Sequence, residues 1–180
     1  SRQERVELLE SCVEVYQKYY NDIADAIREE MGAPQELAAG AQAFLGMGHL
    51  QEAAKILKTF EFEEDLGEHR VFKEPIGVCG LITPWNLPLY LLSWKTAPAL
   101  ATGNAVVAKP SELTPLTADA LAHIMTDVGA PAGAFNLVHG LGAEAGQALC
   151  EHPGVQGISF TGGTATGAIV GATASRTFKK

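Results

Sequence analysis

Four short apolar runs, each followed by a turn with conspicuous polar or glycine residues, constrain the fold of this chain most strongly. The runs cover residues 78–82, 105–108, 135–138 and 157–160, and a helix-like stretch follows each turn. Strands that alternate with helices are typical of a parallel sheet. The sequence therefore predicts an α/β fold with an open parallel sheet and flanking helices. Because the carboxyl ends of parallel strands meet at one edge, we expect the four turns to form one ligand site.

The N-terminal third of the chain has a different pattern. Apolar residues recur at steps of three and four from residue 1 to about 31, which predicts one amphipathic helix. A second helix is expected over roughly 35–59, and the acidic residues 61–70 are expected to form a loop. The alternating core then runs over 71–180. We expect a single domain, residues 1–180, whose N-terminal helices (1–60) lie against the sheet.

Charge and cysteine content limit the partners. The chain has 13 basic and 21 acidic residues and a formal charge of −8, which disfavours nucleic acid and anionic membrane surfaces. The apolar stretches are too short to span a membrane, and no leader is recognised. Cys12, Cys79 and Cys150 are sparse, as in reduced cytoplasmic proteins. No metal is expected, because neither the five histidines nor the cysteines have ligand spacing.

A glycine-containing loop follows the last apolar run. Residues 162–167 have the spacing G-x-x-x-x-G and open a helix, whose first backbone N–H groups attract an anion. The spacing differs from the G-x-G-x-x-G dinucleotide fingerprint, and no Lys follows the second glycine as in a Walker loop. Taken alone, this loop is better explained as a tight strand–helix turn.

Lys109 and Glu112 follow the second run. One side chain donates hydrogen bonds and the other accepts them, so the two together can hold a ribose. The carboxylate would repel a 2′-phosphate, which favours NAD over NADP. The alternative is a solvated charge pair at a strand end.

Asn86 lies between two prolines, Pro84 and Pro88, in a stiff turn. An amide held in this way can donate to a developing oxyanion. The alternative is that Asn86 caps the helix that begins near Leu87. The helix after Glu112 is predicted to have Thr114 as its cap and Leu116, Ala120, Leu121, Ile124 and Val128 as its buried stripe.

The chain resembles the aldehyde dehydrogenase superfamily of NAD(P)-dependent enzymes. The resemblance lies in residues 74–78 (EPIGV), 82–88 (ITPWNLP), 98–104 (PALATGN), 109–112 (KPSE), 131–138 (PAGAFNLV) and 160–163 (FTGG), in family order and spacing. It implies a Rossmann-like partial coenzyme-binding domain. In the complete enzyme it implies oxidation of an aldehyde to a carboxylic acid, with NAD, or alternatively NADP, as hydride acceptor.

The resemblance also assigns roles. Asn86 would be catalytic and donate to the thiohemiacetal oxyanion. Leu87, Leu91 and Trp94 would line the aldehyde tunnel. The cofactor would be bound by Ile82, Thr83, Pro84 and Trp85, by Lys109, Ser111 and Glu112, by Gly142 and Gly146 on the adenine side, and by Phe160, Gly162, Gly163, Thr164 and Gly167 at the phosphates.

Several departures from the family are expected. Gly163 replaces the usual Ser, so a hydroxyl to the pyrophosphate is missing. The general-base Glu, the nucleophilic Cys and the catalytic domain are expected to be absent, as are the N-terminal strands and the oligomerisation hairpin. The chain alone is therefore predicted to be inactive, whereas the full-length protein would form a homodimer or homotetramer. The alternatives are a non-catalytic remnant that binds a dinucleotide or other subunits, and an unrelated flavodoxin-like or Rossmann protein.

Overall fold

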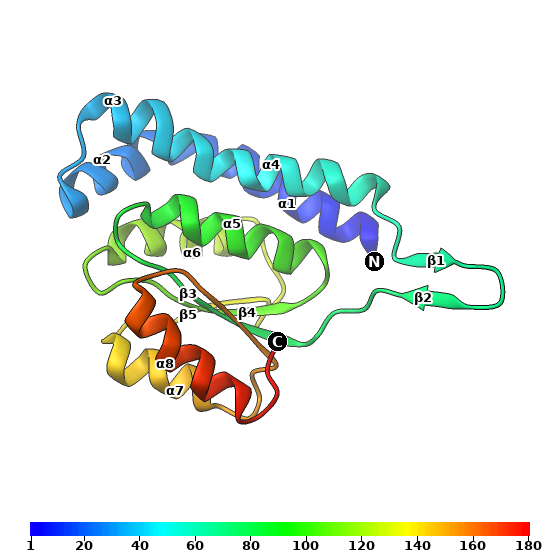
Figure 1. Ribbon diagram of the computed structural model, residues 1–180. Helices are drawn as coiled ribbons and strands as arrows, with labels where there is room; N and C mark the ends of the chain where they lie inside the picture. Colours follow the sequence, from blue (N-terminus) through cyan, green and yellow to red (C-terminus); the bar gives the residue numbers. More distant parts are fainter.

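The core of the structure is a four-stranded parallel sheet. The computed structural model describes residues 1–180, and Figure 1 shows the sheet between layers of helices. Its strands are β3 (Val78–Ile82), β4 (Ala105–Lys109), β5 (Phe135–Leu137) and β6 (Gly157–Phe160), in the order β5-β4-β3-β6. Each predicted apolar run is a strand. The predicted α/β fold with an open parallel sheet is confirmed.

The helices of the core cover both faces of the sheet. Helices α5 (Pro88–Ala101) and α6 (Pro115–Asp127) lie on one face, and α7 (Gln147–Glu151) and α8 (Thr164–Ser175) lie on the other (Figure 1). The chain proceeds from β3 through β4 to β5 in one direction and then returns to place β6 on the other side of β3. This reversal makes the carboxyl ends of β3 and β6 the topological switch point, the place where open α/β sheets bind ligands.

The predicted N-terminal helix is divided into two, α1 (Arg2–Lys18) and α2 (Tyr20–Met31), so the prediction of one helix is wrong. The break lies at Tyr19, whose hydroxyl donates to Asp127 at 2.7 Å, while the hydroxyl of Tyr20 donates to the carbonyl of Ala39. The change of direction lets α1 lie against α5 and α2 against α6. The apolar period continues through the break and therefore does not reveal it.

The second predicted helix is present over 35–59 and contains a wide turn. It consists of α3 (Gln35–Leu37), the π-helical segment η1 (Ala38–Ala43) and α4 (Phe44–Thr59). Helix α4 lies on α1 and α5 and, with α1 and α2, forms an outer layer above α5 and α6 (Figure 1). No helix of the chain combines the length and apolar composition that crossing a bilayer requires.

Residues 61–70, expected to form a loop, contribute to an antiparallel hairpin of β1 (Glu63–Asp65) and β2 (Arg70–Phe72). The chain thus contains a hairpin that the sequence analysis, which expected the family's oligomerisation hairpin to be absent, did not predict. The carboxylate of Asp65 accepts a bond from the N–H of Gly67 in the turn. All six strand residues are exposed, and the hairpin projects away from the helices (Figure 1).

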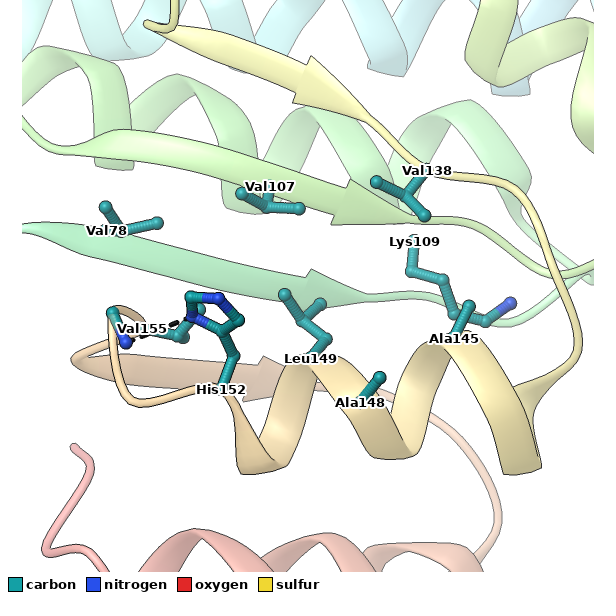
Figure 2. A pocket seen from close by; sticks show the side chains of 10 residues that line it. Val78, Val107, Lys109, Val138, Ala145, Ala148, Leu149, His152 and Val155 are labelled. Carbon is teal, nitrogen blue, oxygen red and sulfur yellow. Dashed lines mark hydrogen bonds between the residues drawn. The ribbon is translucent and has the colours of Figure 1, made fainter.

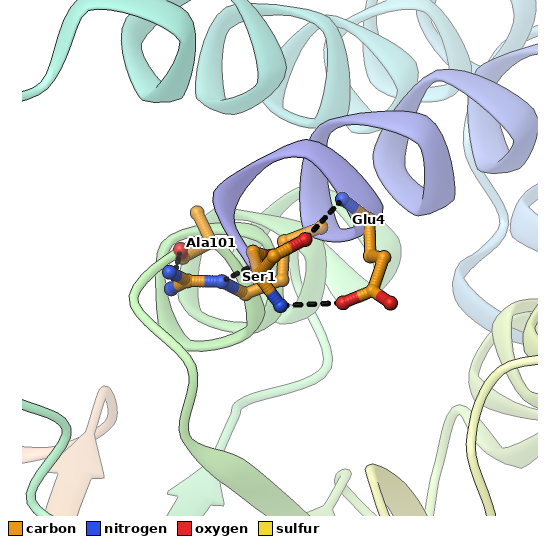
Figure 3. Close-up of polar contacts among 4 residues, drawn as sticks. Ser1, Glu4 and Ala101 are labelled. Atoms are coloured by element: carbon orange, nitrogen blue, oxygen red, sulfur yellow. Dashed lines mark hydrogen bonds and ion pairs between the residues drawn. The ribbon is translucent and has the colours of Figure 1, made fainter.

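Helix α1 anchors the base of this hairpin. Ser1 and Glu4 cap the helix reciprocally (Figure 3). The next residue, Arg5, donates to the carbonyl of Ala101 at the end of α5, and its guanidinium lies 5.1 Å from the ring centroid of Phe62. The cation–π contact joins the chain segment before β1 to both helices.

The two faces of the sheet are buried unequally. A core of 26 buried residues fills the side of α5 and α6 and continues to α1, α2 and α4. On the side of α7 and α8, a cluster of four is buried: Ile82, Leu149, Cys150 and Val155. Within the predicted stripe of α6, Leu121 and Ile124 are buried, but Leu116 is exposed, so its assignment is wrong.

Candidate functional site

The carboxyl edge of the sheet brings the turns together. Ile82 at the end of β3 is in register with Lys109 on one side and Phe160 on the other. The ladder continues one residue further, because the N–H of Thr83 bonds to Lys109 and the N–H of Thr161 bonds to Ile82. The turns after β3, β4 and β6 therefore leave the same edge.

Asn86 lies on this edge with a free side chain. Helix α5 begins at Pro88 with Leu87 as its cap residue, and no side chain caps it. The alternative assignment of Asn86 as the cap is therefore wrong. Asn86 and its neighbour Trp85 are exposed, and the Asn86 side chain does not bond to the start of α5. The amide is thus available to a ligand at this edge.

Lys109 is buried, although Glu112 is not. The Lys109 side chain is 3 % exposed and its Nζ lies 3.7 Å from Oε2 of Glu112, whose side chain is 48 % exposed. Nζ also donates to the carbonyl of Pro110. Burial lowers the pKa of Lys109, and the charge of Glu112 opposes this shift. A fully solvated charge pair is excluded, because the lysine side chain is buried and its amine donates to the carbonyl of Pro110.

Ser111 supports that turn. Its Oγ accepts a hydrogen bond from the N–H of Leu113 at 3.2 Å, so the hydroxyl organises the backbone between β4 and α6. Thr114 is the cap residue of α6, but its hydroxyl makes no hydrogen bond. The prediction of a Thr114 side-chain cap is wrong. Glu30 from α2 accepts from the N–H groups of Leu116 and Thr117 in its place.

The glycine loop encloses an aromatic ring. A Cβ at Gly162 would lie 2.5 Å from Cζ of Phe160, and a Cβ at Gly167 would lie 3.4 Å from the same ring. At Gly163 the space is open, with no atom within 4 Å. Gly163 is the cap residue of α8, which begins at Thr164. The helix therefore presents its first N–H groups at the carboxyl edge.

Gly142 and Gly146 bound the segment η2 (Gly142–Gly146), which leads into α7. A Cβ at Gly146 would lie 3.6 Å from Cδ of Lys109, whereas Gly142 has open space beside it. Gly146 thus lies over the buried stem of the lysine. The structure places Gly142 at the start of the segment, on its open side.

An apolar cavity of about 410 Å³ lies beneath α7, and sequence reasoning missed it. Figure 2 shows Val78, Val107 and Lys109 facing side chains of α7, with His152 at the far end. The lining residues are Val78, Val107, Lys109, Val138, Ala145, Ala148, Leu149, His152, Gly154 and Val155. Val78, Val107 and Val138, which lie in or directly after β3, β4 and β5, were the available signal. The cavity adjoins Lys109 and provides an apolar surface beside its charge.

The predicted tunnel residues lie along α5. Trp94 is 54 % exposed, and Leu87 and Leu91 are half-buried. Leu91 and Trp94 are three residues apart, which places them on one side of α5, and Leu87 is the cap residue of α5, directly after Asn86. Two residues that the sequence analysis did not select, His49 and Tyr90, lie against Trp94, with ring centroids 5.4 Å away in each case.

Lys95 was also missed. Its Nζ donates to Oγ of Ser159 in β6 at 2.7 Å, and burial lowers its pKa. A single lysine in an apolar helix gives little signal, because only packing decides whether its amine reaches solvent. In the structure it joins α5 to the strand that leads into the glycine loop.

None of the three thiols is an activated nucleophile. Burial raises the pKa of Cys12 to about 12 and also raises the pKa values of Cys79 and Cys150. A nucleophilic cysteine needs a lowered pKa and access to substrate. Cys79 lies near the start of β3, away from the carboxyl edge, and Cys150 is buried in α7.

The donor set at the edge fits a nicotinamide dinucleotide. The N–H groups that begin α8 suit phosphates, the Lys109–Glu112 pair suits ribose hydroxyls, and open space beside Gly163 admits a group close to the backbone. Thr83, at the same edge, has a buried hydroxyl without a hydrogen-bond partner. The free amide of Asn86 completes the set.

Comparison with known proteins gives a consistent result. The chain matches the aldehyde dehydrogenase family over residues 1–180. It is 50 % identical, over all of its length, to 3-succinoylsemialdehyde-pyridine dehydrogenase from a Pseudomonas species. Its fold superposes with a TM-score of 0.98, at 42 % identity, on a mutant of aldehyde dehydrogenase C from Pseudomonas syringae in complex with NAD⁺ and octanal. With betaine aldehyde dehydrogenase from Staphylococcus aureus in complex with NAD⁺, the TM-score is 0.95 at 32 % identity.

All of the chain is covered in each of these three comparisons, but it spans only 37–38 % of the relatives' length. The similarity thus concerns one part of a longer enzyme, and it includes the sheet and every turn described above. With a match over all 180 residues, this chain belongs to the aldehyde dehydrogenase family.

Proposed function

We propose that these residues form most of the coenzyme-binding domain of an NAD-dependent aldehyde dehydrogenase, and that the complete protein oxidises an aldehyde to a carboxylic acid. The observation that carries the proposal is the free amide of Asn86 on the same sheet edge as the Lys109–Glu112 pair. A structural asparagine in a stiff turn would use its amide to hold the turn. Asn86 does not cap α5, and its exposed amide supports a role toward a ligand.

Each residue has a distinct part in holding the coenzyme. Glu112 accepts from the ribose hydroxyls and Lys109 donates to them, while the start of α8 and the exposed Trp85 contact the pyrophosphate. The carboxylate of Glu112 disfavours a 2′-phosphate, which supports NAD over NADP. When bound, NAD accepts the hydride of the oxidation.

Asn86 acts on the substrate. Its Nδ2–H donates to the aldehyde oxygen as negative charge develops there, an interaction worth about 3 kcal/mol where comparable donors have been removed. The nucleophilic thiol and the general base come from other parts of the protein, because the three thiols here are shielded. These 180 residues alone are therefore expected to turn over no aldehyde.

The coenzyme assignment is tested by calorimetric titration of this chain with NAD. Glu112→Ala is expected to weaken binding about tenfold, since a hydrogen bond to a charged group is lost. Glu68→Ala, in the exposed hairpin turn, is the matched control and should leave binding unchanged. Absence of heat from the unsubstituted chain would contradict coenzyme binding by this part of the protein.

The catalytic assignment needs the complete protein. NADH formation, followed by absorbance, is expected with an aldehyde, and Asn86→Ala should lower kcat by a factor of roughly one hundred. A complete protein that binds NAD but produces no NADH would favour the second candidate, a non-catalytic remnant that binds a dinucleotide or other subunits.

The hairpin β1–β2 is the observation that favours a subunit interaction. Its strands are exposed on both faces and include Val71 and Phe72, which a second chain could cover. We propose that the complete protein is a homodimer or homotetramer that uses this hairpin, and that it resides in the cytoplasm, consistent with three free cysteines.

A further inference from the structure

Met31, the last residue of α2, is the most exposed of the three methionines. It is half-buried, whereas Met47 and Met125 are 8 % and 3 % exposed. The sulfur of Met125 also lies inside the main core, 3.8 Å from Sγ of Cys12. A thioether that solvent reaches is open to oxidation to the sulfoxide. A small oxidant therefore reaches the side chain of Met31 before the other two.

Gln42, in the wide turn η1, directs its amide at this sulfur. Its Nε2 donates to Sδ of Met31 at 3.3 Å, and the residue is 2 % exposed. A thioether is only a weak acceptor, and Oε1 of Gln42 has no hydrogen-bond partner. The two tyrosine hydroxyls that reach this segment, those of Tyr16 and Tyr20, donate to backbone carbonyls of η1 instead. The thioether of Met31 is thus the one partner of a buried amide.

An amide this deeply buried is normally well paired. Because Gln42 donates only to a poor acceptor, its amide would gain from a stronger acceptor at the position of the sulfur. Oxidation of Met31 supplies one, since the sulfoxide oxygen is polar and accepts hydrogen bonds. The methionine side chain has three rotatable bonds, which let that oxygen turn toward Nε2 without a movement of α2.

We propose that Met31 is a site of oxidation by peroxide and that Gln42 binds the sulfoxide formed there. A lone pair of Sδ attacks one oxygen of hydrogen peroxide, and the S–O bond forms as the O–O bond breaks. The departing hydroxide takes up the remaining proton as water, so sulfur is oxidised and the peroxide is reduced. Methionine sulfoxide reductases reverse the change. The site is independent of the proposed dehydrogenase chemistry, because it uses neither coenzyme nor aldehyde.

Peptide mass spectrometry of the complete protein, after brief treatment with hydrogen peroxide, tests the position of the site. The sulfoxide of Met31 should form roughly tenfold faster than those of Met47 and Met125, because both of these residues are buried. Equal rates at the three methionines would overturn the proposal.

Urea denaturation before and after the same treatment tests the role of Gln42. Oxidation should leave the unfolding midpoint of the unsubstituted protein unchanged or raise it. In Gln42→Leu it should lower the midpoint by about 0.5 M, since the sulfoxide oxygen then has no donor. Gln51→Leu, on the exposed side of α4, is the matched control, and Met31→Leu measures any shift caused by other methionines. An equal fall in the unsubstituted protein and in Gln42→Leu would contradict binding of the sulfoxide by Gln42.

A further comparison needs neither an oxidant nor a change at Gln42. In Met31→Gln the new amide oxygen takes the place of the sulfoxide oxygen, whereas Met31→Leu offers no acceptor. Met31→Gln should therefore have the higher urea midpoint. The reverse order would show that the Gln42 amide does not bind an acceptor at this position, and the proposal would fail.

Discussion

Gly162 and Gly163 are neighbours in the sequence, but a side chain would meet different surroundings at each position. At Gly162 a Cβ would collide with the ring of Phe160, whereas at Gly163 it would enter open space. Gly163 also has φ −69° and ψ 148°, angles that any residue adopts. The fold therefore requires glycine at position 162 but not at position 163. A different residue at position 163 could change coenzyme binding without disturbing the fold.

Gly163→Ser is therefore expected to preserve or slightly increase stability, by a few tenths of a kcal/mol, because serine caps a helix better than glycine does. The added hydroxyl should also tighten NAD binding. Urea unfolding and calorimetric titration check the two effects.

Gly162→Ser is the matched control, since it makes the same chemical change one residue earlier. It should cost about 1–3 kcal/mol, because the Phe160 ring must move out of its packed position. Equal stabilities of the two variants would refute this distinction between the glycines.

Helix α6 illustrates how one element depends on another. The carboxylate of Glu30, at the end of α2, accepts hydrogen bonds from Leu116 and Thr117, two of the free N–H groups that begin α6. The cap residue Thr114 leaves its own hydroxyl unpaired. The cap of this helix thus comes from more than eighty residues away in the sequence.

Glu30→Ala should lower the free energy of unfolding by about 1–2 kcal/mol, since two helix N–H groups lose an anionic acceptor. Glu29→Ala is the control: this neighbour is exposed and makes no such contact. Both values come from urea denaturation. A loss of similar size in the two variants would assign the effect to helix α2 itself.

For the molecule as a whole, the main core joins the sheet to the outer layer of helices and encloses groups that ionise in water. Cys12 is fully buried there, with its Sγ 3.8 Å from the sulfur of Met125. Burial raises its pKa to about 12, and the pKa of Tyr16 is raised as well. The folded chain therefore keeps protons at high pH that the unfolded chain releases.

Stability should fall as the pH rises above about 8.5, where the thiol of the unfolded chain ionises while the folded thiol stays protonated. The contribution of the Cys12 thiol to the free energy of unfolding is complete below that pH. It is lost progressively as the pH rises to about 12. The loss reaches at most about 1.4 kcal/mol per pH unit. Cys12→Ala, less stable at neutral pH because of its cavity, should show a shallower decline in unfolding free energy. If the free energy of unfolding fell equally steeply with pH in the unsubstituted chain and in Cys12→Ala, the assignment of this decline to Cys12 would be contradicted.

Much of the fold could be predicted because its signals are local. Each strand of the sheet is a short apolar run, and the turns carry proline or glycine. The hairpin was missed because its strands have three residues each, mostly charged, with no buried face to produce an apolar alternation. The break at Tyr19 was missed because contacts with Asp127, not a local breaker, accompany it.

The sequence by itself determined the parallel sheet and the presence of its marked turns at one edge, because strand direction and apolar runs dictate both. Only the tertiary structure decided the environment of each side chain. It left Asn86 free, buried Lys109, supplied Glu30 to α6 and placed His49 against Trp94. Such contacts join residues far apart in the chain, and their geometry depends on how whole helices pack, which no local pattern encodes.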